Sequence, residues 1–175
     1  MQRRHKVIIG IACAILVAVA VYQWLHWFRE ATSVQQRGSI TVRKETIRLF
    51  SSDGTSRLSN RVLEVRSDIP DREKADIILR ELKKDKVIAA GVQLRDTAVG
   101  LDGILYVNVS RNLAETYPGA PPEMLMVYSL VNSFTSNFKD VNKVQLLLDG
   151  EPVYTIRGVV YTYLPLEFNK DFMED

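Results

Sequence analysis

Residues 7–25 form an apolar run without a charged side chain, and a short basic tail, residues 1–6, precedes it. As a helix, a run of this length spans roughly 28 Å, close to the roughly 30 Å of a bilayer's hydrocarbon core. Trp24 and Trp27 lie where such a helix reaches the lipid headgroups, a depth that amphipathic aromatic rings prefer. The pattern predicts a transmembrane anchor over residues 7–28.

The orientation of this anchor follows from its basic tail. Arg3, Arg4 and Lys6 lie next to the free amino terminus, and clustered positive charge tends to stay in the cytoplasm. We therefore expect a single-pass protein of the inner (cytoplasmic) membrane, with its N-terminus inside and its domain on the outer, periplasmic or extracellular, side.

Two other interpretations of the same segment compete with the anchor. Residues 18–20 read Ala-Val-Ala, which resembles the cleavage site of a secretory signal. Apolar residues continue past that site to Leu25 without a helix breaker, which favours an uncleaved segment. A lipoprotein signal ending at Cys13 would have only residues 7–12 as its apolar core, which is too short.

The remainder of the chain divides into a linker, one domain and a tail. Residues 29–38 are mostly polar, and full extension from residue 26 to residue 38 spans at most roughly 40 Å. Residues 39–168 match a single domain of ordinary size, and residues 169–175 are expected to form a C-terminal tail.

Charge and residue inventory exclude several classes of function. The chain has a net charge of +2, but its first 30 residues hold four basic and one acidic side chain, so the remainder carries about −1. A nucleic-acid partner is not expected, because the domain lacks a basic excess. Cys13, His5 and His26 are the only cysteine and histidines. The domain therefore has no thiol nucleophile, imidazole base or ordinary zinc ligands, and we expect no cofactor and no metal.

Hydrophobic periodicity predicts an α+β domain. Two helices are expected, one opening at Asp71 with an apolar stripe through Leu82, and one opening near Pro121 with a stripe through Phe138. Alternation and turn signals predict strands at residues 46–50, 58–66, 92–99, 104–109, 143–148 and 153–156. The order is approximately β-β-α-β-β-α-β with a short C-terminal strand, and both helices are expected to pack on one mixed or antiparallel sheet.

Several segments resemble a known family. They read Leu-Tyr-Val-Asn-Val-Ser at 105–110, Tyr-Pro-Gly at 117–119, Val-Tyr-Ser-Leu-Val-Asn-Ser-Phe-Thr at 127–135 and Val-Gln-Leu-Leu-Leu-Asp-Gly at 144–150. This pattern is similar to the GerMN domain of sporulation and spore-germination proteins, which also occurs in other bacterial envelope proteins. The resemblance implies a small α+β envelope domain with no established catalytic activity and no catalytic residues to carry over.

Few residues of the domain are candidates for a site. Tyr117, Pro118 and Pro121 belong to a loop whose tyrosine and prolines could present a preorganised face to a partner. Asn132 lies mid-helix, where its propensity is poor, and is expected to form a structural polar link between helix and sheet. Asp149 and Gly150 are expected to make a turn.

The leading hypothesis is a non-catalytic envelope module, integral to the membrane, that contacts a protein partner, a second copy of itself or peptidoglycan. One alternative is an enzyme that cleaves cell-wall glycans with carboxylates alone, for which the candidates are Asp96, Asp102, Glu115 and Glu123. The other is a secreted ligand-binding domain released by cleavage after Ala20.

Overall fold

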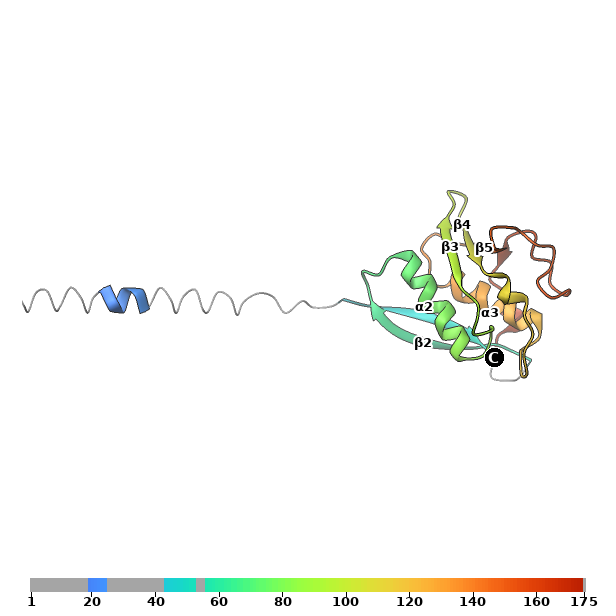
Figure 1. Ribbon diagram of the computed structural model, residues 1–175, viewed down its shortest axis with the longest axis horizontal. Helices are drawn as coiled ribbons and strands as arrows, with labels where there is room; N and C mark the ends of the chain where they lie inside the picture. The colour runs from blue at the N-terminus through green and yellow to red at the C-terminus, as the bar shows by residue number, and fades with distance from the viewer. Residues whose placement is uncertain (1–18, 25–42, 53–55, 175) are drawn as a thin grey trace, which may run out of the picture. The chain divides into compact units, whose positions relative to one another are not determined.

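The computed structural model describes residues 19–24, 43–52 and 56–174. Apart from the helical residues 19–24, the predicted anchor lies outside this range, as do the basic tail and the linker. Within the described segments, no helix has the length and hydrophobicity needed to cross a bilayer. The chain separates into two units, Met1–Val42 and Arg43–Asp175, and the fold below is that of the second unit (Figure 1).

The folded unit confirms the predicted α+β order. Its elements are β1 (Lys44–Ser51), β2 (Ser59–Arg66), α2 (Asp71–Lys84), β3 (Leu94–Val99), β4 (Ile104–Val109), the short 3-10 helix η1 (Arg111–Ala114), α3 (Glu123–Thr135), β5 (Lys143–Leu148), β6 (Leu166–Glu167) and the 3-10 helix η2 (Lys170–Phe172). Proline precedes both long helices, at Pro70 and Pro122. Its fixed φ suits a helix start, and the N–H that it lacks is not missed there.

The strands form two sheets, which corrects the prediction of one. β1 and β2 make an antiparallel pair, and the second sheet has the order β3-β4-β5-β6, with β4 parallel to β5. Side chains of the segment that includes α3 occupy the other edge of β1. Asn137 accepts from Arg48 N (2.8 Å) and donates to Arg48 O (2.6 Å), and Ser133 Oγ accepts from Phe50 N (3.0 Å). These side chains thus bind backbone groups of Arg48 and Phe50, and β1 pairs with β2 alone.

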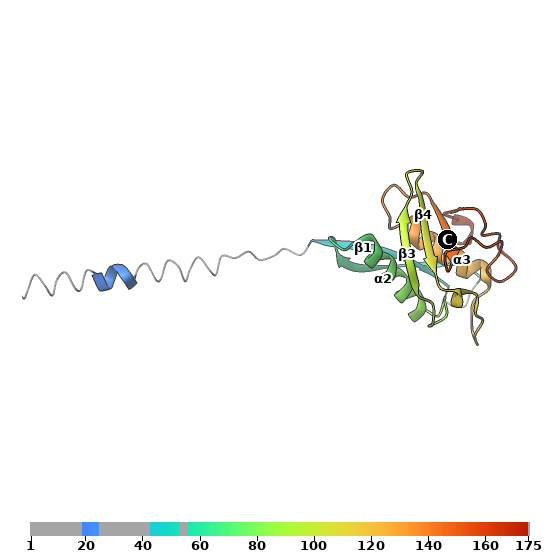
Figure 2. The same cartoon turned by 45° about the horizontal axis from the view of Figure 1, so that its top comes forward.

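The core lies between the helices and the two sheets. On β4, Leu105, Val107 and Val109 are buried, as the alternation of a strand with one covered face requires. Parallel β4 and β5 are joined through α3, because a parallel pair needs a crossover connection. Figure 2 shows β3 and β4 side by side with α3 behind them, and the loop between β4 and α3 emerges at the end of β4.

Two predictions about the C-terminal part were wrong in detail. Residues 153–156 form no strand; the segment 152–165 is irregular, and β6 instead takes the edge beside Lys143 and Val144 of β5. The residues expected to form a tail attach to the domain. Met173 bridges to Leu58, and the ring of Phe172 stacks on Tyr128 at 4.8 Å between centroids.

Candidate functional site

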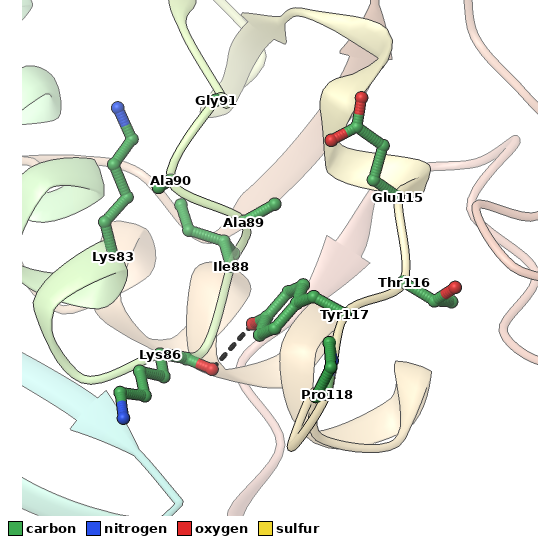
Figure 3. Close-up of a pocket in the computed structure, with 10 residues that line it drawn as sticks. All are labelled: Lys83, Lys86, Ile88, Ala89, Ala90, Gly91, Glu115, Thr116, Tyr117 and Pro118. Carbon is green, nitrogen blue, oxygen red and sulfur yellow. Dashed lines mark hydrogen bonds between the residues drawn. The ribbon is translucent and has the colours of Figure 1, made fainter.

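A pocket of about 480 Å³ opens between the end of α2 and the loop that precedes α3. Tyr117 and Pro118, two of the three predicted contact residues, line it, whereas Pro121 does not. The complete lining is Lys83, Lys86, Ile88, Ala89, Ala90, Gly91, Glu115, Thr116, Tyr117 and Pro118 (Figure 3).

Tyr117 connects the two walls of this pocket. Its hydroxyl donates a hydrogen bond of 2.6 Å to the carbonyl oxygen of Lys86. Lys86 has a φ of 57°, directly after the α2 cap residue Asp85, which is the left-handed conformation that commonly ends a helix. Partial burial raises the pKa of the Tyr117 phenol, and the positive charge of Arg157 opposes this shift. The phenol is therefore a hydrogen-bond donor that holds the loop against the end of α2.

The pocket combines an apolar floor with charged groups around it. Ile88 and Ala89 are buried, and the side chains of Lys83 and Lys86 point away from Tyr117 (Figure 3). Glu115 lies on the opposite wall and is exposed. Such an arrangement suits an apolar group of a partner flanked by an acidic one. Glu115 is the one carboxylate among these ten lining residues, so they do not include the pair of carboxylates that glycan cleavage uses.

Arg157 anchors the Tyr117 loop through hydrogen bonds to its backbone. The guanidinium of Arg157 donates to the carbonyl oxygens of Leu113 (3.2 Å), Glu115 (2.7 Å) and Pro121 (3.4 Å). Sequence reasoning missed this residue. The available signal was that Arg157 is the only charged side chain in the segment 152–165. These hydrogen bonds tie the loop to the segment 152–165.

Glu123, a candidate catalytic acid, holds the same region together from the first turn of α3. Its side chain is buried, and its two oxygens accept hydrogen bonds from the backbone N–H groups of Ile156 (2.9 Å) and Val159 (2.7 Å). The structure gives this carboxylate a structural task, because both of its oxygens are engaged by backbone donors.

The other carboxylates considered for glycan cleavage have separate surroundings. Asp96 pairs with Arg72 at 3.2 Å on the surface. Asp102 accepts from the backbone N–H of Ile104 at 3.2 Å in the turn between β3 and β4. Among residues 19–24, 43–52 and 56–174, no three His, Cys, Asp or Glu side chains come together as metal ligands would.

Asn132 links α3 to the end of the chain instead of to a sheet. Its amide is fully buried; Nδ2 donates to Asn169 O and Oδ1 accepts from Asn169 N, both at 2.9 Å. A fully buried amide needs partners for both its donor and its acceptor, and the Asn169 peptide group supplies them.

Asp149 and Gly150 form the turn that follows β5, with φ values of 49° and 92°. The Asp149 carboxylate accepts from Arg95 Nε (3.0 Å) and from the backbone N–H of Arg111 (3.3 Å). The hydrogen bond from Arg95 is the main reason why the pKa of Asp149 lies below its usual value. This turn therefore joins β3, β5 and η1.

The sequence profile of the Germane family, described as "Sporulation and spore germination", matches residues 48–154, more than half of the chain. The chain belongs to the Germane family. The predicted resemblance to GerMN domains is thereby confirmed, and the match includes the Tyr117 pocket. It ends at residue 154, so Arg157 and the rest of the C-terminal segment lie beyond it.

Two solved structures share the Germane fold. The first GerMN domain of the sporulation protein GerM from Bacillus subtilis superposes with a TM-score of 0.56 at 16% identity, over 73% of this chain and 98% of that domain. The tandem GerMN domains of the same protein give 0.55 at 12% identity, over 78% of this chain and 50% of theirs. The comparison with curated proteins found no match. At these identities, the likeness is one of fold.

Proposed function

We propose that this Germane-family chain is a non-enzymatic module of the cell envelope. In this proposal, residues 7–28 anchor it in the inner membrane, and its domain contacts a protein partner on the outer side. The observation that carries the proposal is the family match over residues 48–154, which spans most of the folded unit. Three polar side chains with several hydrogen bonds each bind backbone groups of the chain itself. They are Glu123, Asn132 and Arg157.

The Tyr117 pocket is the proposed contact surface. Its apolar floor would take an apolar side chain of the partner, and Lys83 and Lys86 would attract an acidic neighbour of that side chain. The hydrogen bonds of Tyr117 and Arg157 already hold the loop in place. Binding then costs little ordering entropy, which is the advantage of a preorganised surface.

The anchor supports the same proposal through proximity. An apolar run of bilayer length precedes a linker of at most roughly 40 Å. A domain on such a tether stays near the membrane surface, where a partner in the same membrane is present at a high effective concentration. Contact with a second copy of this chain would exploit the same effect.

Site-specific photo-crosslinking of the full chain in native membranes tests this proposal. A benzophenone amino acid at Thr116, an exposed residue that lines the pocket, is expected to capture a partner protein or a second copy. The control position is Leu101, which is fully exposed in the β3–β4 turn and is expected to give no specific adduct.

The variant Tyr117→Ala removes the ring that lines the pocket and should reduce the Thr116 adduct severalfold. Recovery of monomer alone from every position would contradict the proposed contact. Turnover of purified peptidoglycan that disappears in Glu115→Gln would contradict the non-enzymatic assignment.

A further inference from the structure

Three tyrosines lie together on the surface of the segment 152–165. Tyr154, Tyr161 and Tyr163 are 68%, 51% and 41% exposed. The rings of Tyr154 and Tyr163 stack with centroids 4.8 Å apart and planes inclined by 13°, and Tyr161 lies 6.3 Å from each of them. We call this cluster of Tyr154, Tyr161 and Tyr163 the tyrosine platform.

The backbone beneath the tyrosine platform is firmly held. Thr162 is buried; its N–H donates to Tyr154 O (2.8 Å), and its hydroxyl donates to Val153 O (2.9 Å). Gln145 of β5 donates to Thr162 O at 2.9 Å. With Thr162 fixed inward, its neighbours Tyr161 and Tyr163 point outward beside Tyr154. The rings are therefore presented on an ordered surface, which reduces the entropy cost of binding.

The segment that carries the platform has a single charged side chain. Arg157 is the one charged side chain of the segment 152–165, and its guanidinium binds backbone carbonyls of the Tyr117 loop. A surface for nucleic acid or anionic lipid would place basic side chains beside the aromatic rings. The platform therefore favours a neutral ligand.

We propose that the tyrosine platform binds an uncharged glycan chain. A pyranose ring has a flat C–H face that packs on an aromatic ring and a hydroxyl edge that bonds to phenols. The exposed rings of Tyr154, Tyr161 and Tyr163 supply the first contact, and their hydroxyl groups supply the second.

A protein partner fits this cluster less well. Protein hot spots bury their aromatic anchors in desolvated pockets, whereas these three rings lie exposed and carry hydroxyl groups.

The glycan assignment rests on the proposed function in one respect. A domain on the outer side of the membrane is within reach of cell-wall glycans, which a cytoplasmic domain would not meet.

The test uses the full chain in lipid nanodiscs, without sugar-based detergents, and chitotriose (three N-acetylglucosamine units, uncharged) as the probe. Titration calorimetry is expected to detect binding. Tyr154→Ala and Tyr163→Ala should each weaken it about tenfold, because each removes one stacking contact. Tyr154→Phe keeps the ring and should weaken binding less than Tyr154→Ala does.

The matched control is Tyr106→Ala on β4, which removes a tyrosine that is 36% exposed outside the platform and should leave affinity unchanged. Unfolding curves of every variant report whether the domain is intact. Absence of chitotriose binding, or unchanged affinity in folded Tyr154→Ala and Tyr163→Ala, would overturn the proposal.

The Thr116 photo-adduct separates this inference from the proposed protein contact. If the adduct persists while chitotriose binding is absent, the glycan assignment is wrong and the partner contact stands. If chitotriose binds and depends on the tyrosines while no adduct forms, the platform is supported and the partner contact is not. If the wild type does not bind chitotriose and the tyrosine variants lose the Thr116 photo-adduct, the platform is a protein interface and the glycan assignment is wrong.

Discussion

Asn132 and Asn169 exchange two hydrogen bonds, each 2.9 Å long, between a buried side-chain amide and a backbone peptide group. This pair joins the middle of α3 to the residues just before η2. It explains why residues 169–174, expected from the sequence to be part of a C-terminal tail, belong to the folded unit.

Replacing Asn132 with alanine should therefore destabilise the domain. The change removes both hydrogen bonds to the half-buried Asn169 peptide group and should cost about 1–3 kcal/mol in the free energy of unfolding. Urea unfolding measures this, and hydrogen exchange should show faster exchange at residues 169–173. The control is Asn142→Ala, at an exposed asparagine, with an expected change below about 0.5 kcal/mol. Equal stability of the two variants would contradict the role of the pair.

The Glu123 carboxylate should be required for the order of the segment 152–165. Glu123→Gln replaces one acceptor oxygen with an NH₂ group that faces a backbone donor, and should cost about 2 kcal/mol of stability. Amide exchange at Ile156 and Val159 should accelerate. Glu151→Gln, at an exposed position, provides the comparison and should have little effect. Unchanged protection of Ile156 and Val159 in Glu123→Gln would rule out this contact as the restraint.

Tyr117→Phe isolates the hydrogen bond that closes the candidate pocket. The ring stays and only the 2.6 Å bond to Lys86 O is lost, so we expect a loss of about 1 kcal/mol in the free energy of unfolding. The control is Tyr161→Phe, whose exposed hydroxyl should contribute little. A Tyr117→Phe domain as stable as the wild type would show that this hydrogen bond does not stabilise the fold.

The same tyrosine should make stability sensitive to alkaline pH. Burial raises the pKa of Tyr117, so its neutral form stabilises the fold fully below about pH 10, the usual value for a phenol. That contribution is lost as the pH rises through the raised pKa of the folded state. The free energy of unfolding should be measured from about pH 8 to about pH 11, a range that includes the usual phenol pKa. It should decline less steeply with pH in Tyr117→Phe than in the wild type. Parallel declines would contradict the assignment.

Acid should weaken the domain partly through Glu81. The hydrogen bond from Lys84 is the largest cause that lowers the pKa of Glu81, and Arg61 at 3.1 Å adds to it. A lowered pKa means that this stabilisation is present above the usual glutamate value of about 4.3 and is lost as the pH falls through the folded-state pKa. In Glu81→Gln, the loss of stability below that pH should be smaller than in the wild type. Glu64→Gln, at an exposed pair with Lys44, serves as the comparison.

Elements whose burial repeats with a regular period could be predicted from the sequence. The predicted bounds of β4 and β5 agree with the structure, because one covered face imposes strict alternation on β4 and the other strand is almost continuously buried. The stripe from Ala75 to Leu82 likewise predicts α2, since one side of that helix faces the core.

The division into two sheets could not be predicted in this way. Beside β1 lie Asn137 and Ser133, whose side chains bond to its backbone groups 89 and 83 residues away in the sequence. Nothing in local periodicity distinguishes such an amide or hydroxyl from one that faces solvent. The expected strand at 153–156 failed for a related reason, because the Ile156 N–H is taken by the Glu123 carboxylate.

The candidate site was predictable only in part. The Tyr-Pro-Gly turn indicated the loop, but the opposite wall of the pocket, at Lys83 and Lys86, follows from how α2 ends. The tyrosine platform requires the chain to fold back at Gly158, where φ is 97°. Spacing along the sequence does not show which tyrosines then meet.

Protease accessibility of the full chain in intact spheroplasts, followed with an antibody to the C-terminus, tests the central claim most directly. The claim is that a retained anchor presents a binding domain outside the cytoplasm. The chain should sediment with membranes, and added protease should digest the folded domain without lysis. An intact chain free in the cytosol, or a domain digested only after lysis, would contradict it.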